Sequence, residues 1–283
     1  MQTNSFSGQP PVVLITGYRG LAETLIAEFL QSNALTSALV RDEKAIGALR
    51  DKFPGGHFFS GDAVNGSDCK RWIDCVMGEF GRIDCLVNNA AVTGPGGKTH
   101  DISFIDFRLT LDINFLAPVR LIKFVLPVFL KQGSGVVINL SGGGATQGRP
   151  NFGAYASSKC ALVRFTETIA QEYPELQFYA MSPGGLMTPM IEKMLAMDPH
   201  AIGAEYTEAK RRLEHGGEDP LKAARLARWL LEHRPTKLSG TLISAVWDDY
   251  EHTDQLSQNG DWWRLRRVDT VLQEKLGAYQ ERT

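Results

Sequence analysis

Short apolar runs alternate with amphipathic helical patterns along most of this chain, and this alternation constrains the fold more than any other feature. After Gly20, for example, Leu21, Leu25 and Phe29 recur at the spacing of one helix face. Parallel strands need crossover connections, so strands that alternate with helices predict a parallel sheet covered by helices on both faces. We therefore expect a doubly wound α/β sheet of about seven strands, at residues 11–16, 37–40, 57–60, 83–87, 135–140, 177–181 and 238–246.

The length of 283 residues suffices for one hydrophobic core, so a second domain is not required. We expect a flexible N-terminus at residues 1–10, an α/β domain at 11–246 and a C-terminal extension at 247–283. From about 185 to 220 methionines are interleaved with glycine, proline and charge, which indicates a substrate lid in the form of a long loop. We expect a first helix from residue 20 onward and further helices at residues 43–50, 68–80, 104–131, 155–172 and 221–233.

Charge and composition argue against several classes of function. The formal net charge is −2 and there is no long Lys/Arg run, so neither nucleic acid nor an acidic membrane surface is an expected partner. Residues 121–130 are interrupted by Lys123 and Pro127 and fall short of the ~20 residues of a membrane span. The polar N-terminus has no secretory pattern, which favours a cytoplasmic protein. The cysteines and histidines lack ligand spacing, so we expect neither disulfides nor a metal site.

Three local patterns point to chemistry. A glycine-bearing turn, Thr16 to Ala22, joins the first strand to a helix, where backbone N–H groups can approach a pyrophosphate; such glycines can equally serve a tight turn without a ligand. Asn88 and Asn89 directly follow the fourth strand, at the sheet edge that faces the ligand crevice. In Tyr155-Ala-Ser-Ser-Lys159 the i and i+4 positions place a phenol and an ammonium on one helix face.

Over roughly residues 11 to 246 the order of these motifs resembles the short-chain dehydrogenase/reductase superfamily. The resemblance implies a Rossmann-type dinucleotide-binding and catalytic domain. It also implies that Tyr155 is the general acid/base, that Lys159 lowers the phenol pKa and holds the nicotinamide ribose, and that Asn114 anchors a water. The remaining residues that it implies for cofactor binding are Gly17, Arg19, Gly20, Leu21, Asp62, Ala63, Asn89, Ala90, Pro183, Gly184, Leu186 and Thr188.

The choice of cofactor depends on charge at the end of the second strand. Arginine pairs with a ribose 2′-phosphate, whereas an acidic residue receives a 2′-hydroxyl and repels the phosphate. The strand ends in Val40-Arg41-Asp42, and Arg19 lies in the glycine turn. This pairing favours NADP(H) over NAD(H). The alternative is that Asp42, not Arg41, meets the ribose.

The chain departs from the superfamily pattern at its glycine turn and after the fifth strand. The glycine turn is one residue short and ends in Ala22, and Ala91 replaces a glycine. Counting back from Tyr155, the position of the superfamily's catalytic serine falls on Gly142, with Ser141 one position early and Thr146 four late. We expect the freedom of the glycine run to bring the Ser141 hydroxyl within hydrogen-bond reach of Tyr155 or of the bound carbonyl. Arg149, in the same segment, could meet a carboxylate or phosphate, or be a solvated loop residue.

The sequence thus predicts an oxidoreductase that transfers a hydride between NADP(H) and a small-molecule carbonyl or secondary alcohol. The alternative is a non-catalytic NADP(H)-binding sensor or scaffold of the same fold. Apolar residues almost encircle the helix near 112–130, and the resemblance implies that it pairs with 155–172 across a two-fold axis, so we expect a homodimer or homotetramer. Trp262 and Trp263 are expected to cover the active-site mouth or a neighbouring subunit, or to pack on their own subunit.

Overall fold

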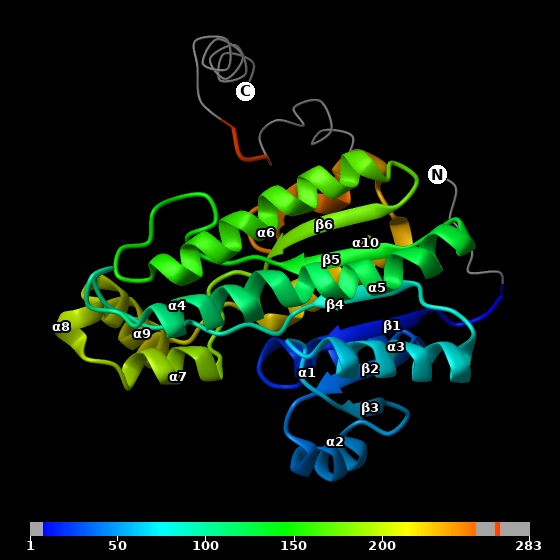
Figure 1. Cartoon of the computed structure of the whole chain (residues 1–283), viewed down its shortest axis with the longest axis horizontal. Coiled ribbons are helices and arrows are strands. Elements are labelled where there is room, and N and C mark those ends of the chain that lie inside the picture. Colours follow the sequence, from blue (N-terminus) through cyan, green and yellow to red (C-terminus); the bar gives the residue numbers. More distant parts are fainter. Residues whose placement is uncertain (1–7, 253–263, 267–283) are drawn as a thin grey trace.

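The computed structural model describes residues 8–252 and 264–266, and in these residues seven parallel strands form one sheet (Figure 1). Their order across the sheet is β3-β2-β1-β4-β5-β6-β7, which reverses direction between β1 and β4 as a doubly wound Rossmann-type sheet does. The strands are β1 Val12–Thr16, β2 Leu35–Val40, β3 His57–Ser60, β4 Cys85–Asn88, β5 Val136–Leu140, β6 Gln177–Ser182 and β7 Leu242–Ser244.

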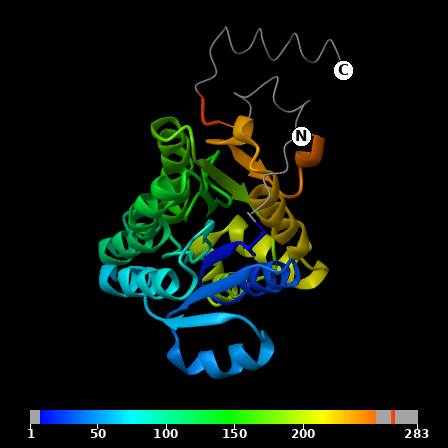
Figure 2. The same ribbon diagram turned by 90° about the vertical axis from the view of Figure 1, so that its right-hand side faces the viewer.

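Helices cover both faces of this sheet, so the expected fold class is confirmed (Figure 2). All strands point to one edge, where the three short helices α7, α8 and α9 lie (Figure 1). The helices are α1 Leu21–Gln31, α2 Ile46–Lys52, α3 Gly66–Phe80, α4 Phe104–Leu111, α5 Ala117–Gln132, α6 Gly153–Glu172, α7 Pro189–Leu195, α8 Pro199–Ile202, α9 Ala204–His215 and α10 Pro220–His233.

The first strand shows why both layers form. Successive strand residues point to opposite faces, and all five residues of β1 are buried. Val13 and Ile15 belong to the apolar cluster that includes α1 and α10. Val12 and Leu14 belong to the cluster on the other face, with α3 and α5. A continuous apolar run therefore satisfies two helical layers at once.

Two expected elements differ in the structure. The last strand is only β7 Leu242–Ser244, because residues Thr236–Leu238 form a 3₁₀ turn before it. The single helix expected at 104–131 is divided into α4 and α5 by a π-helical turn, Asp112–Leu116. Such wide turns insert an extra residue into the helix and frequently occur at functional sites.

The expected lid loop is largely helical. Pro189 is the first residue of α7 and Pro199 is the first residue of α8, and the fixed φ of proline suits a first helical turn. Ile191 and Met194 of α7, Ile202 of α8 and Ala209 of α9 bury themselves in one apolar cluster with Phe152 and Tyr155. The apolar spacing of the lid is therefore that of short packed helices and not that of an open loop.

Among the described helices, the stretch Phe104–Gln132 alone is long and apolar enough to cross a membrane by length and composition, with a mean hydropathy of 1.8 in its most apolar window. The sequence indicated a shorter apolar stretch, residues 121–130, because Lys123 and Pro127 interrupt it, whereas in the structure the helix continues through both residues. Since α5 buries Leu121 and Val125 in the sheet cluster, it packs as a core helix of the α/β layer. The helix nevertheless exposes large apolar side chains at Phe104, Ile105, Leu109, Leu116 and Leu130.

We expect the chain to self-associate through the exposed apolar side chains of this helix, because neighbouring exposed apolar side chains commonly mark protein interfaces. Ile105 and Leu109 lie one helical turn apart on α4 and are 70% and 47% exposed. The double change Ile105→Lys and Leu109→Lys is expected to dissociate the oligomer, measured by sedimentation at micromolar concentration. The matched control is Leu213→Lys, which charges a leucine of α9 that is 57% exposed. A parent protein that sediments as a 31.2 kDa monomer contradicts the expectation.

Candidate functional site

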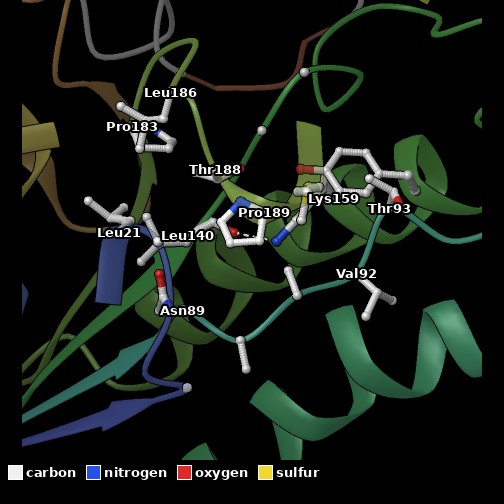
Figure 3. A pocket seen from close by; sticks show the side chains of 18 of the residues that line it. Leu21, Asn89, Val92, Thr93, Leu140, Lys159, Pro183, Leu186, Thr188 and Pro189 are labelled. Carbon is white, nitrogen blue, oxygen red and sulfur yellow. Dashed lines mark hydrogen bonds between the residues drawn. The ribbon is translucent and has the colours of Figure 1, made fainter. Parts of the chain in front are cut away.

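One cavity of about 930 Å³ lies at the carboxyl edge of the sheet and brings together segments far apart in the sequence. Figure 3 shows side chains from four of these segments, Leu21, Asn89, Lys159 and Thr188, around this space. Every residue expected to bind cofactor or to act in catalysis lines the cavity, with the exception of Asn114. The residues so placed are Gly17, Arg19, Gly20, Leu21, Arg41, Asp62, Ala63, Asn89, Ala90, Ser141, Tyr155, Lys159, Pro183, Gly184, Leu186 and Thr188.

The glycine turn is fixed by Thr16, the last residue of β1. The Thr16 hydroxyl accepts hydrogen bonds from the backbone N–H groups of Asn89 and Ala90, both at 2.9 Å. The Asn89 amide donates in return to the Thr16 carbonyl at 3.0 Å. Gly17 has a φ of +85°, and a Cβ there would lie 3.3 Å from the Asn89 side-chain nitrogen. The turn therefore approaches the segment after β4 closely, and α1 begins at its end with Leu21.

Two groups hold the carboxylate that follows β2. The Arg19 guanidinium lies 3.7 Å from Asp42, and the Tyr18 hydroxyl donates to the same carboxylate oxygen at 3.3 Å. Asp42 also caps the next turn by accepting from the Lys44 backbone N–H. Arg41 is exposed and lines the cavity. This end of the cavity thus carries two guanidinium groups, of Arg19 and Arg41, and one carboxylate that is bound by Arg19 and Tyr18.

Tyr155 and Lys159 occupy the other part of the cavity and are both buried. The Lys159 ammonium donates to the Leu140 carbonyl at the end of β5, at 2.7 Å, and lies 5.8 Å from the centre of the Tyr155 ring. Burial lowers the pKa of Lys159 to about 8. Burial also raises the pKa of Tyr155 above its ordinary value, opposed first by Arg149 and then by Arg212. Lys159 is not among the groups that shift this pKa, and its ammonium is bound to a backbone oxygen, so the expectation that Lys159 lowers the pKa of Tyr155 stays a prediction.

Gly142, and not Ser141, faces the phenol. A Cβ built on Gly142 would lie 2.4 Å from the Tyr155 hydroxyl oxygen. The expected hydrogen bond from Ser141 to Tyr155 is absent: the Ser141 hydroxyl is buried and has no hydrogen-bond partner among the described residues. The reason is that the Ser141 N–H still pairs with the Met181 carbonyl and so continues the sheet, which leaves the following residue to face the phenol. Thr146 lines a separate, smaller cavity.

Asn114 lies behind the cavity, in the π-helical turn between α4 and α5. Its amide nitrogen donates to the Val92 carbonyl at 2.9 Å and to the Ser158 hydroxyl at 3.1 Å. Its amide oxygen accepts from the Val92 N–H at 2.8 Å. Asn114 therefore ties the segment after β4 to α6, next to Tyr155 and Lys159. Its expected contact with a water stays a prediction.

Charged side chains form a wall that the sequence did not indicate. Arg149 is mostly buried and pairs with Glu205 of α9 at 2.6 Å, so it is not a solvated loop residue. On α9, Glu208 lies one helical turn after Glu205 and Arg212 lies two turns after it. Glu208 pairs with Arg212 at 2.8 Å, and these three residues and Arg149 all line the cavity. Their i, i+3 and i+7 spacing could have identified one helix face, but only if the lid had been recognised as helical. Trp247, which is exposed, also lines the cavity; Trp262 and Trp263 lie outside the described residues.

Comparisons with known proteins agree on one family. A family model described as short chain dehydrogenase matches residues 11–199. L-fucose dehydrogenase of Mus musculus is 30% identical over 210 residues, which cover 72% of this chain and 76% of that protein. An uncharacterized oxidoreductase of Saccharomyces cerevisiae is 28% identical over 242 residues, 82% of this chain and 94% of its own.

Solved structures show the same likeness. The crystal structure of that yeast oxidoreductase is similar with a TM-score of 0.79 at 26% identity, and the match covers 86% of this chain and 98% of the yeast chain. A structure of ElxO with NADP bound has a TM-score of 0.73 at 22% identity, covering 84% of this chain and 97% of that one, a likeness of fold.

The contact between Gly142 and the phenol yields a sharp test. Gly142→Ala forces the Tyr155 hydroxyl to move, and a displacement of about 1 Å at a reacting group can reduce turnover by roughly 10²-fold. Gly143→Ala is the matched control, because a Cβ at Gly143 meets nothing within 4 Å. Turnover and thermal unfolding of both variants are measured. Equal turnover in the two variants would show that the space at Gly142 is not needed.

Proposed function

The chain belongs to the short-chain dehydrogenase family, and from this premise we propose that it transfers a hydride between NADP(H) and a carbonyl or secondary alcohol, with Tyr155 as general acid/base. Family membership makes it an oxidoreductase. The observation that carries the finer proposal is the shared cavity, in which a buried phenol and ammonium lie at one part and a glycine turn at another.

The residues at the glycine turn fit a dinucleotide. At the start of α1 the N–H groups of Ala22 and Glu23 donate to the carbonyls of Arg19 and Gly20, and the N–H of Leu21, which has no such bond among the described residues, is left to approach a pyrophosphate. A Cβ at Gly17 would enter the narrow space beside Asn89, so glycine keeps this approach open. Ala22, which replaces the usual last glycine, is buried in the apolar core and is not among the residues that line the cavity. When bound, the nicotinamide cofactor supplies or accepts the hydride.

Proton transfer falls to Tyr155 and Lys159. Because burial raises the pKa of the phenol, Tyr155 stays protonated at neutral pH, which is the form needed to donate a proton to a carbonyl oxygen during reduction. Alcohol oxidation needs the phenolate, which the same burial disfavours. Lys159, with a pKa of about 8, lies one helical turn away from Tyr155. It can return a proton toward Tyr155 when its hydrogen bond to the Leu140 carbonyl breaks.

The proposed preference for NADP(H) is supported by the ion pair and the hydrogen bond that Asp42 makes. Its carboxylate is bound by Arg19 and Tyr18, so its repulsion of a 2′-phosphate is reduced. Arg41 stays available beside it to pair with that phosphate.

We propose a polar, hydroxylated substrate. The part of the cavity around Tyr155 is lined by the two ion pairs Arg149–Glu205 and Arg212–Glu208, whose charged groups can both donate and accept hydrogen bonds to hydroxyl groups. The name of the mouse relative, L-fucose dehydrogenase, specifies a substrate of this class for that protein. L-fucose is therefore the first compound to test, with apolar ketones as the comparison.

Tyr155→Phe is expected to reduce turnover by about 10²–10⁴-fold and to leave NADPH affinity nearly unchanged, because only the transferable proton is lost. Tyr173→Phe, at the other end of α6, is the control and should match the parent. Turnover is followed by NADPH absorbance and affinity by fluorescence titration. Parental turnover in Tyr155→Phe contradicts the assignment, and NADPH binding without turnover of any compound in a broad panel favours the non-catalytic sensor or scaffold.

Arg41→Asp is expected to weaken NADPH binding by about 10–100-fold and NADH binding by much less, because a carboxylate then opposes the 2′-phosphate. Arg50→Asp on α2 makes the same change of charge away from the cavity and serves as the control. Dissociation constants for both cofactors are compared across the three proteins. An equal loss for NADPH and NADH in Arg41→Asp would remove the basis for NADP(H) preference.

A further inference from the structure

Arg149 contacts the phenol ring that the proposed function relies on, although it comes from a different segment. Its guanidinium carbon lies 5.0 Å from the centre of the Tyr155 ring and 4.8 Å from that of Phe152, within the range of a cation–π contact. The Arg149 side chain is 14% exposed, so solvent screens its charge little. The guanidinium therefore acts on the ring at short range and with little exposure to solvent.

The glycine run after β5 offers the phenol no side-chain donor. Gly142 faces the Tyr155 hydroxyl and has no side chain, and the Ser141 hydroxyl does not bond to it. A phenol that exchanges a proton in a buried site needs a group that stabilises its charged form, since burial alone favours the neutral form. Among the described residues outside α6, Arg149 is the cation with a cation–π contact to the Tyr155 ring.

We propose that Arg149 is a positioning residue for Tyr155, whose guanidinium, stacked on the ring, supplies the positive field that stabilises the phenolate, and that Glu205 of α9 limits this field through its ion pair with Arg149. The inference rests on the proposed role of Tyr155 as acid/base. It assigns a function to the ion pair that differs from substrate recognition: the pair adjusts how readily the phenol releases its proton.

The other charged groups around the phenol set the background for this effect. Lys159 approaches from α6 itself, 5.8 Å from the ring centre, and is bound to the Leu140 carbonyl. Arg212 of α9 is the second guanidinium that lowers the pKa of Tyr155, and it is paired with Glu208. From α7, Ile191 and Met194 pack in the same cluster as the ring, and Lys193 lines the cavity. Arg149 has the largest lowering effect on the pKa of Tyr155, and Glu205 raises it.

Opposite changes at the two partners give effects of opposite sign. Arg149→Gln removes the cation, so the phenol should ionise at higher pH than in the parent. Glu205→Gln removes the counter-charge and leaves the cation, so the phenol should ionise at lower pH. Arg149→Lys keeps the charge and should recover most of the parental behaviour, which a loss of packing alone would not explain. Lys210→Gln removes an exposed cation of α9 paired with Glu214 and is the matched control.

Ionisation of Tyr155 is followed by NMR titration of the full chain with isotope-labelled tyrosine, the Tyr155 signal being assigned with Tyr155→Phe. The expected order of ionisation, from low to high pH, is Glu205→Gln, then the parent and Lys210→Gln together, then Arg149→Gln. Coincident titrations of Glu205→Gln and Arg149→Gln, or shifts of the same sign in both, overturn the proposal.

Kinetics connects the titration to the reaction. In the oxidation of L-fucose with NADP⁺, the rising limb of kcat/KM against pH should shift in the same order, and Arg149→Gln should lose on the order of tenfold at neutral pH. If turnover depends on Tyr155 but the titrations coincide, only the role of Arg149 fails. If the titrations follow the expected order while Tyr155→Phe keeps parental turnover, the proposed function fails and the electrostatic effect of Arg149 stands.

Discussion

The parallel pairing of β4 with β1 on one side and with β5 on the other is the constraint on which the site depends. Val87 aligns with Ile15 and with Ile138, so the three strands end close together at the same edge of the sheet. Thr16, Asn89 and the glycine turn meet only because of this register. Beneath them Asn88 donates to Asn139, which in turn donates to Thr166 of α6, so buried side chains connect the strand ends to the helix that carries Tyr155. The cavity is therefore a property of the whole sheet.

The opposite edge of the sheet is closed by a buried ionic cluster. The Asp84 carboxylate is fully buried, accepts from the Val12 N–H at 2.9 Å and is held by two hydrogen bonds from Arg82. Arg234, directly after α10, lies 4.0 Å away. A buried carboxylate is stable only with such partners. This cluster joins the first strand, the segment before β4 and the end of α10 at the amino edge, whereas the cavity lies at the carboxyl edge.

The sequence predicted the parts of the site whose geometry is local. Tyr155 and Lys159 share a helix face by spacing alone, and Asn89 follows a buried strand directly. It did not predict the helices of residues 189–215, because their apolar residues are buried by Phe152 and Tyr155, which lie far earlier in the chain. Counting back from Tyr155 placed Gly142 at the position that faces the phenol, but it could not show that Ser141 fails to turn toward Tyr155, since that depends on how far β5 pairs with β6 before the turn. The ion pair of Arg149 and Glu205 joins the segment before α6 to α9, two segments far apart in the sequence, so the sequence did not predict it either.

The three glycines after β5 differ in what they can become. A side chain at Gly142 would meet the phenol, and one at Gly144 would press on Ala156 of α6, whereas Gly143 borders the cavity with open space where a side chain would extend. Of the three, Gly143 is thus the position at which a larger side chain can extend while Tyr155 and its helix stay in place. A change of residue at Gly143 therefore alters the lining of the cavity without displacing the phenol.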